Sequence, residues 1–248
     1  MLIARGPNRP GQRRIGTRPR SQLQGLTGFS ASNYYRSAAA SGGPQGSTSM
    51  TVCAFVRMTT AAPSVIQTLV ARLGAASGGF SLNVVNSTGY ARVQVIDGAT
   101  ATASASNSGL PALVNTDVMV HGVLTGGQLV CYVNGTASSP TAVTGYTAPG
   151  TLRLGIGCNS NAGQPLDSGQ IYGVAICDAT GLSAAQVAAH VYACQRAREL
   201  VQPDGCTYLW HGEDGLQMRS TWEPRIGSWS SVALTGTLSS VRKLPTYG

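Results

Sequence analysis

The feature that most constrains the fold is a succession of short apolar segments, each separated from the next by glycine or by Asn/Ser clusters. In the first segment, residues at every second position (Val52, Ala54, Val56 and Met58) share one face if the backbone is extended. Gly126-Gly127 between two apolar runs is typical of a two-residue hairpin turn. We expect strands within 51–58, 65–72, 79–85, 90–96, 117–136 (two strands), 151–157, 169–177, 207–214 and 230–244.

One helix is expected late in the chain. Ser183 and Gln186 form a capping-box pattern just before an apolar face, and Arg196 lies in the expected last turn. Pro203-Asp204-Gly205 follows and prevents continuation. Many short strands with a single late helix are typical of an all-β fold, an antiparallel sandwich or barrel.

Four motifs appear in an order that resembles the laminin-G-like, concanavalin A-like lectin/glucanase jelly-roll family. They are GGFSLNV (78–84), GGQLVCYVNGT (126–136), TLRLGIG (151–157) and DSGQIYGVAICDATGLSAAQVAAHVYA (167–193). The resemblance implies an antiparallel jelly-roll β-sandwich. The calcium-ligating aspartates of the family have no match in this sequence. Sequence similar to the opening strands of the family lies after the helix, at 207–238.

This resemblance divides the chain into three parts. We expect an extended N-terminal arm over 1–45, the sandwich over 46–202, and a C-terminal extension over 203–248 that supplies additional or closing strands. The first residues show no signal-peptide pattern, and no apolar run is long enough for a membrane span. We therefore expect neither a secretory leader nor a membrane segment.

Positive charge is concentrated at the N-terminus. The chain has 17 basic and nine acidic residues, for a net charge of +8, and its first carboxylate is Asp97. Residues 1–36 are too poor in apolar side chains to form a core, so we expect them to become ordered only against a partner. Arginine favours bidentate contacts with carboxylates or phosphates. The charges are thinly spread, which favours a protein partner over nucleic acid. The arginines expected to bind it are Arg5, Arg9, Arg13, Arg14, Arg18, Arg20 and Arg36.

Catalytic patterns are missing from the sequence. The glycosidase pattern Glu-x-Asp-x-x-Glu does not occur, and the adjacent pair Glu213-Asp214 would face opposite sides of a strand. His121, His190 and His211 are too dispersed for a metal motif. His190 and Cys194 share a helix face, for which packing against the sheet is the favoured interpretation. We expect no enzyme activity, metal or cofactor.

Cysteines and tryptophans admit two interpretations each. The six cysteines have no CxxC spacing, which favours buried thiols over disulfides and leaves their pairing open. Trp210, Trp222 and Trp229 are candidates for stacking on a sugar ring. Contacts in the core or between subunits are the favoured role for them.

These features together predict a non-enzymatic virion structural protein. The resemblance implies a fold that tailed bacteriophages often display, so we expect a capsid decoration or minor capsid or tail component, anchored by its arm to other virion proteins and present in many copies on the particle surface. The alternative is a carbohydrate-binding adhesin that recognises host surface glycans.

Overall fold

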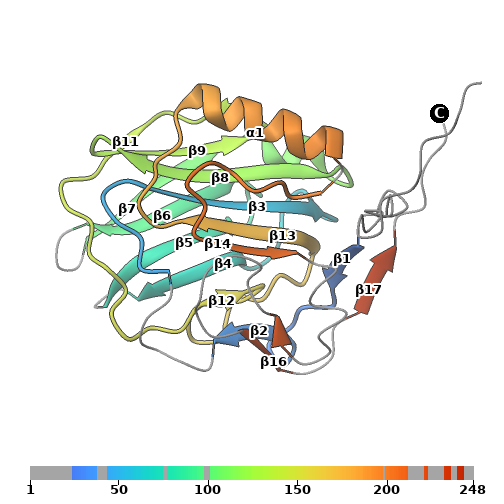
Figure 1. The fold of residues 1–248 in the computed structure, drawn as a ribbon. Helices are drawn as coiled ribbons and strands as arrows, with labels where there is room; N and C mark the ends of the chain where they lie inside the picture. Colours follow the sequence, from blue (N-terminus) through green and yellow to red (C-terminus); the bar gives the residue numbers. More distant parts are fainter. Residues whose placement is uncertain are drawn as a thin grey trace, which may run out of the picture.

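The computed structural model describes residues 24–37, 44–74, 77–97, 101–197, 199–211, 221–222, 232–235 and 239–242. Within these residues two antiparallel sheets lie face to face, with one α-helix against the outside (Figure 1). This arrangement confirms the predicted all-β jelly-roll sandwich with one late helix. None of the described helices has the length and apolar character needed to cross a membrane.

The first sheet carries the helix on its outer face. Its strands, in spatial order, are β10 (Thr136–Ala137), β9 (Gln128–Val133), β8 (Val118–Thr125), β3 (Met50–Met58), β13 (Gly169–Cys177), β1 (Gln24–Thr27) and β17 (Ser239–Arg242). β11 (Thr141–Ala142) also pairs with β9, and β14 (Tyr208–His211) also pairs with β13. Gly126 and Gly127, with φ of 55° and 71°, form the predicted turn between β8 and β9.

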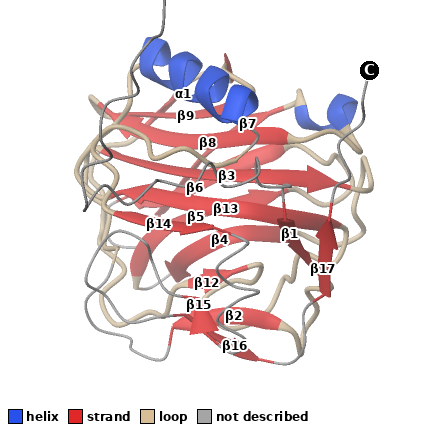
Figure 2. Cartoon of the chain, turned by 45° about the vertical axis from the view of Figure 1, so that its right-hand side comes forward, coloured by secondary structure: helices blue, strands red, loops and turns tan. Residues whose placement is uncertain are grey.

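The second sheet follows the order β15 (Thr221–Trp222), β16 (Val232–Thr235), β2 (Tyr34–Ser37), β12 (Gly155–Ile156), β4 (Gln67–Gly74), β5 (Gly78–Val84), β6 (Ala91–Asp97) and β7 (Ala101–Asn107). A short 3-10 helix, η1 (Leu110–Leu113), precedes β8. In Figure 2 the strands of the two sheets lie one behind the other, with α1 (Ala184–Ala197) along one edge of the view.

Both ends of the chain contribute strands to the sandwich. Residues 24–37, within the range expected to be an extended arm, form β1 and β2, one in each sheet. β1 pairs with β17 and β2 pairs with β16, so blue and red segments lie side by side in Figure 1. This part of the expected arm is therefore incorporated into the fold. Residues 1–23 lie outside the described residues.

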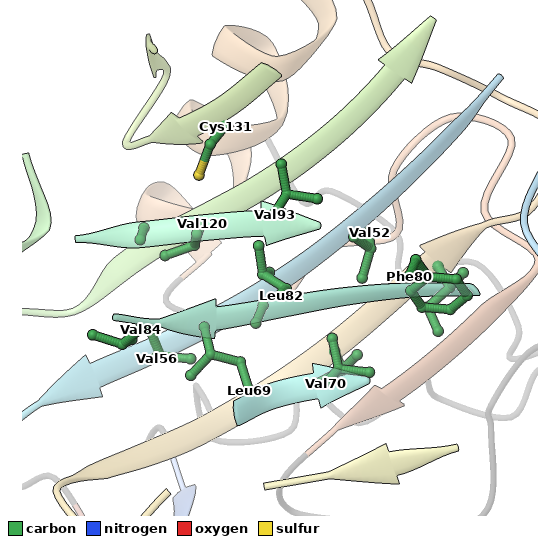
Figure 3. Packing of buried hydrophobic residues seen from close by; sticks show 14 of the residues in the cluster. Val52, Val56, Leu69, Val70, Phe80, Leu82, Val84, Val93, Val120 and Cys131 are labelled. Atoms are coloured by element: carbon green, nitrogen blue, oxygen red, sulfur yellow. The ribbon is translucent and has the colours of Figure 1, made fainter. Parts of the chain in front are cut away.

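Apolar side chains fill the space between the sheets. Val52 and Val56 from β3 face Leu82 and Val84 from β5, with Val120 of β8 close by (Figure 3). A second apolar layer lies between the outer face of the first sheet and α1, and it includes Phe55, Met119, Val187 and Val191. β3 is buried on both faces, which explains why its sequence is almost continuously apolar.

The helix begins with the predicted capping box. The backbone N–H of Gln186 donates to Ser183 Oγ over 3.3 Å, and the backbone N–H of Ser183 donates to Gln186 Oε1 over 2.9 Å. All six cysteines are free thiols, five of them buried and Cys206 partly exposed. The favoured interpretation of the cysteines is therefore correct.

Candidate functional site

Polar side chains gather on β5, β6 and β7, on the face of the second sheet that points away from the core. Because Phe80, Leu82 and Val84 point into the core, the residues between them point outward. The strand registers align these outward positions into two rows that cross all three strands. The rows are Asn83–Arg92–Ser106 and Ser81–Gln94–Ser104; we call these six residues the polar face.

Hydrogen bonds hold the polar face in one arrangement. Arg92 Nε donates to Asn83 Oδ1 over 2.9 Å, and Asn83 Nδ2 donates to Gln94 Oε1 over 3.0 Å. Asn83 Nδ2 also reaches Ser81 Oγ at 3.0 Å. Among the described residues, the Arg92 guanidinium is held through Nε alone, so its two terminal nitrogens remain available to a ligand. Partial burial lowers the pKa of Arg92, which nevertheless remains charged at neutral pH.

An exposed aromatic ring adjoins these polar rows. The Val85 N–H donates to the Tyr90 carbonyl, which extends the β5–β6 pairing to Tyr90. By alternation Tyr90 lies on the same side as Arg92, and its side chain is 38 % exposed. An aromatic ring beside amide, hydroxyl and guanidinium groups provides an apolar surface and directional hydrogen-bond donors for a polar ligand.

The polar face is rich in hydrogen-bond donors and acceptors and poor in carboxylates. In the described parts of β5, β6 and β7 the single carboxylate is Asp97, at the end of β6. Its oxygens accept hydrogen bonds from Thr144 and Gly145, which lower its pKa. Glycoside hydrolysis generally requires a pair of carboxyl groups across the scissile bond. These strands supply no such pair.

A second cluster of polar groups lies between the first sheet and α1. Cys53 of β3 and His121 of β8 are cross-strand neighbours, and His190 faces them from α1. One ligand atom from each of the three lies within 4.8 Å of the others. Cys194 Sγ lies 3.3 Å from His190 Nε2, so it adjoins the same group. We call Cys53, His121, His190 and Cys194 the His–Cys cluster.

The His–Cys cluster is deeply buried and electrically neutral. Burial, followed by the nearby His190, lowers the pKa of His121 to about 3. Burial also raises the pKa of the Cys53 thiol and of the Cys194 thiol, the latter to about 11. His121 Nδ1 is buried without a hydrogen-bond partner among the described residues.

A cleft of about 210 Å³ adjoins one member of this cluster, His190. It lies between α1 and the segment after it, with His190 in its wall. Gln186, Ala193, Val201 and Asp204 also line it. His190 is 6 % exposed and forms part of the cleft wall.

The sequence missed both sites. Its interpretation of the histidines as dispersed is wrong for two of them, because His121 and His190 are hydrogen-bonded at 2.8 Å. The signal was present in the i, i+4 spacing of His190 and Cys194, but the register that places Cys53 beside His121 is not visible in a sequence. The alternation of apolar and polar residues in 79–85 and 90–96 is the sequence signal that could have indicated the polar face.

The tryptophans expected to contact a glycan or a subunit are not brought together by the described residues. Trp210 is fully buried and stacks on Tyr208, with ring centroids 5.9 Å apart, so it cannot contact a ligand. Core packing, the favoured alternative for this residue, is its actual role. Trp222 lies in β15 beside Val232, and Trp229 lies outside the described residues.

Most arginines of the expected arm lie outside the described residues. Arg36 lies in β2, and its guanidinium carbon is 5.5 Å from the centre of the Tyr34 ring. The other six, Arg5, Arg9, Arg13, Arg14, Arg18 and Arg20, lie outside the described residues, as does the Glu213-Asp214 pair.

Three solved structures illustrate the similarity in fold. The mouse laminin alpha1 chain, domains LG4-5, is 15% identical with a TM-score of 0.46, covering 64% of this chain and 42% of the laminin chain. The CBM40 of Ruminococcus gnavus IT-sialidase, bound to sialyllactose, is 16% identical (TM-score 0.44; 58% and 83% covered). A heptameric pentraxin from Limulus polyphemus is 14% identical (TM-score 0.49; 87% and 97% covered).

These likenesses concern backbone arrangement and say nothing about ligands. The chain spans less than half the length of the laminin chain and of a botulinum neurotoxin binding-domain chain that it also matches. No curated protein matches the sequence. The model of one family matches residues 29–188, well over half of the chain. The protein therefore belongs to the concanavalin A-like lectin/glucanases superfamily.

Proposed function

We propose that the protein is a non-enzymatic binding domain that takes a glycan on the polar face of β5, β6 and β7. The observation that carries this proposal is the hydrogen-bonded set Arg92–Asn83–Gln94, which is fixed by the sheet and leaves the two terminal nitrogens of Arg92 without a hydrogen-bond partner among the described residues. Membership of a lectin-type superfamily supports the same assignment.

The chemistry of the polar face favours an acidic sugar. A guanidinium with two available nitrogens matches a carboxylate in bidentate geometry. Ser104 and Ser106 are exposed and can exchange hydrogen bonds with sugar hydroxyls, and Tyr90 supplies a ring for stacking. A sialylated or uronic-acid-containing oligosaccharide therefore fits better than a neutral one.

Glycan binding is tested with the full chain on immobilised oligosaccharides, acidic and neutral, followed by calorimetry with the best ligand. We expect Arg92→Gln and Asn83→Ala each to weaken binding at least about tenfold, since hydrogen bonds to charged groups contribute about 1.5–3 kcal/mol. Arg196→Gln is the matched control, because Arg196 is an exposed residue of α1, and α1 packs against the first sheet and not the second. A folded chain that binds no glycan, or binding that survives Arg92→Gln, refutes the proposal.

A second role is favoured by the distribution of charge. Six arginines precede residue 21, and no acidic residue occurs before Asp97. We propose that this segment anchors the domain to other virion proteins of a tailed bacteriophage, as a multi-copy capsid decoration or minor capsid or tail component on the particle surface. A protein partner is favoured over nucleic acid because the charges are widely spaced.

Limited trypsin digestion tests this anchoring role. In the free chain we expect rapid cleavage after Arg5 through Arg20, and in the intact particle we expect those sites to be protected. Deletion of residues 1–20 should abolish attachment to the particle while leaving glycan binding unchanged. Equal cleavage in both states, or attachment without these residues, rules the anchor out.

A further inference from the structure

We propose that Cys53, His121 and His190 form a binding site for a thiophilic transition-metal ion, with Zn²⁺ as the best-fitting ion. The three side chains converge from β3, β8 and α1, although they are far apart in the sequence, and one ligand atom of each lies within 4.8 Å of the others. Thiolate and imidazole are preferred ligands of Zn²⁺, and three protein ligands leave a fourth position for water. Calcium and magnesium prefer oxygen ligands, and the cluster contains no carboxylate.

Charge balance supports this assignment. An isolated ion is costly to bury in an apolar layer, and this layer contains Phe55, Met119 and Val187. The Cys53 thiolate would offset one of the two positive charges of Zn²⁺. The ion would displace the proton of this thiol on binding.

The surroundings of His190 have the form expected around a metal ligand. His190 Nε2 lies 2.8 Å from the Val201 carbonyl oxygen, which can only accept, so Nε2 carries the proton and Nδ1 presents its lone pair toward His121. A ligating histidine commonly donates its other N–H to a backbone carbonyl in this way. Binding requires the His121–His190 hydrogen bond to open.

A buried nitrogen without a hydrogen-bond partner is a separate indication of a metal site. His121 Nδ1 is enclosed and accepts no hydrogen bond from the described residues. A buried polar atom without a partner costs about 1–3 kcal/mol, so a group that satisfies His121 stabilises the fold. The cleft beside His190 brings the surface close to the cluster.

The test uses the full chain, stripped with a chelator and then titrated with Zn²⁺ and with Co²⁺ as a spectroscopic probe. We expect one equivalent of metal per chain, thiolate-to-cobalt charge-transfer bands and the intense visible bands of tetrahedral Co²⁺. Zn²⁺ should raise the thermal midpoint of the wild-type chain because it binds the folded state. Affinity should rise with pH, since the Cys53 proton is released.

Variants separate this cluster from other thiols. Cys53→Ala and His121→Ala should each weaken Zn²⁺ binding by more than about 100-fold, given that losing even an outer-shell partner costs about 10–100-fold. Cys131→Ala is the matched control, since Cys131 is also buried but belongs to the core between the sheets. Circular dichroism establishes that each variant is folded.

Two outcomes overturn the assignment. One is a folded wild-type chain that gives no charge-transfer band with Co²⁺ and no thermal shift with Zn²⁺. The other is a metal signal that persists at full strength in both Cys53→Ala and His121→Ala, which would place the ion elsewhere.

Discussion

His121 Nε2 and His190 Nδ1 lie 2.8 Å apart, and this contact joins β8 to α1 across 69 residues of sequence. Because the Val201 carbonyl fixes the proton on His190 Nε2, His121 must be the donor in this bond. Both imidazoles are therefore neutral, and each orients the other. Within the described part of the chain, this hydrogen bond joins α1 to a first sheet that it otherwise contacts through a largely apolar layer.

Removing this link is expected to loosen the helix. His190→Ala leaves the His121 N–H buried without an acceptor, which costs about 1–3 kcal/mol in the free energy of unfolding. Urea denaturation in the presence of a chelator measures this loss, and hydrogen exchange should show weaker protection of the α1 amides. Tyr192→Ala is the control, because Tyr192 is 64% exposed on the same helix. Unchanged α1 protection in His190→Ala would show that the apolar contacts alone hold the helix.

Trp210 should behave as a core residue. Its side chain is fully buried, and Nε1 has no hydrogen-bond partner among the described residues. Trp210→Ala is expected to cost about 3–5 kcal/mol in the free energy of unfolding. Trp210→Phe should cost less, because it retains a large ring and removes the unpaired N–H. A stable Trp210→Ala chain that has lost glycan binding would contradict this role.

Alkaline pH should destabilise the protein through its buried thiols. Burial raises the pKa of Cys131 from 9.0 to about 12, so between these values the folded chain retains a proton that the unfolded chain releases. Stability therefore falls as pH rises above 9, by about 1.4 kcal/mol at pH 10 for this thiol. Urea denaturation at pH 8 and pH 10 should show a smaller decrease in Cys131→Ala than in the wild type. Equal decreases would mean that Cys131 does not contribute.

Local patterns in the sequence predicted the local structure. Alternation at Val52, Ala54 and Val56 located β3, and Gly126-Gly127 located the β8–β9 turn. The capping residues Ser183 and Gln186 located the start of α1. Each of these signals arises from interactions within a few residues, and a sequence displays such interactions directly.

Long-range pairing was not predictable in the same way. β1 pairs with β17 in the register Gln24↔Arg242, and no local pattern in residues 24–27 indicates that partner. The proximity of His190 to His121 was not predictable for the same reason, because it depends on strand register and on where the helix packs against the sheet. The alternation of polar residues within a strand indicates which side chains share one side of the sheet, but not which of them form hydrogen bonds. Asn83, Arg92 and Gln94 were therefore not identified from the sequence.

Close approach of the two sheets leaves no room for a side chain at Gly122. A Cβ there would lie 2.3 Å from Val93 Cγ2 and 2.6 Å from Val93 Cβ. We expect Gly122→Ala to lower the free energy of unfolding by about 1–3 kcal/mol, and Val93→Ala in the same chain to recover part of that loss. Gly145→Ala is the control, because no heavy atom lies within 4 Å of its Cβ position. A neutral Gly122→Ala would show that the sheets separate readily.

Arg72 of β4 connects two loop segments to the second sheet through hydrogen bonds. Its fully buried guanidinium donates to the Leu152, Pro44 and Gly150 carbonyls over 2.8, 2.9 and 3.2 Å, respectively. Arg72→Met retains much of the volume but leaves three carbonyls without this donor, at about 1–3 kcal/mol for each one that water does not reach.

We therefore expect Arg72→Met to lower the free energy of unfolding by about 3 kcal/mol or more, as measured by urea denaturation. Arg72→Lys should fall between Arg72→Met and the wild type, because an ammonium cannot span three carbonyls in a planar fork. Arg153→Met is the control, since Arg153 is exposed just after the same loop. If Arg72→Met were no more costly than Arg153→Met, water rather than Arg72 would satisfy these carbonyls.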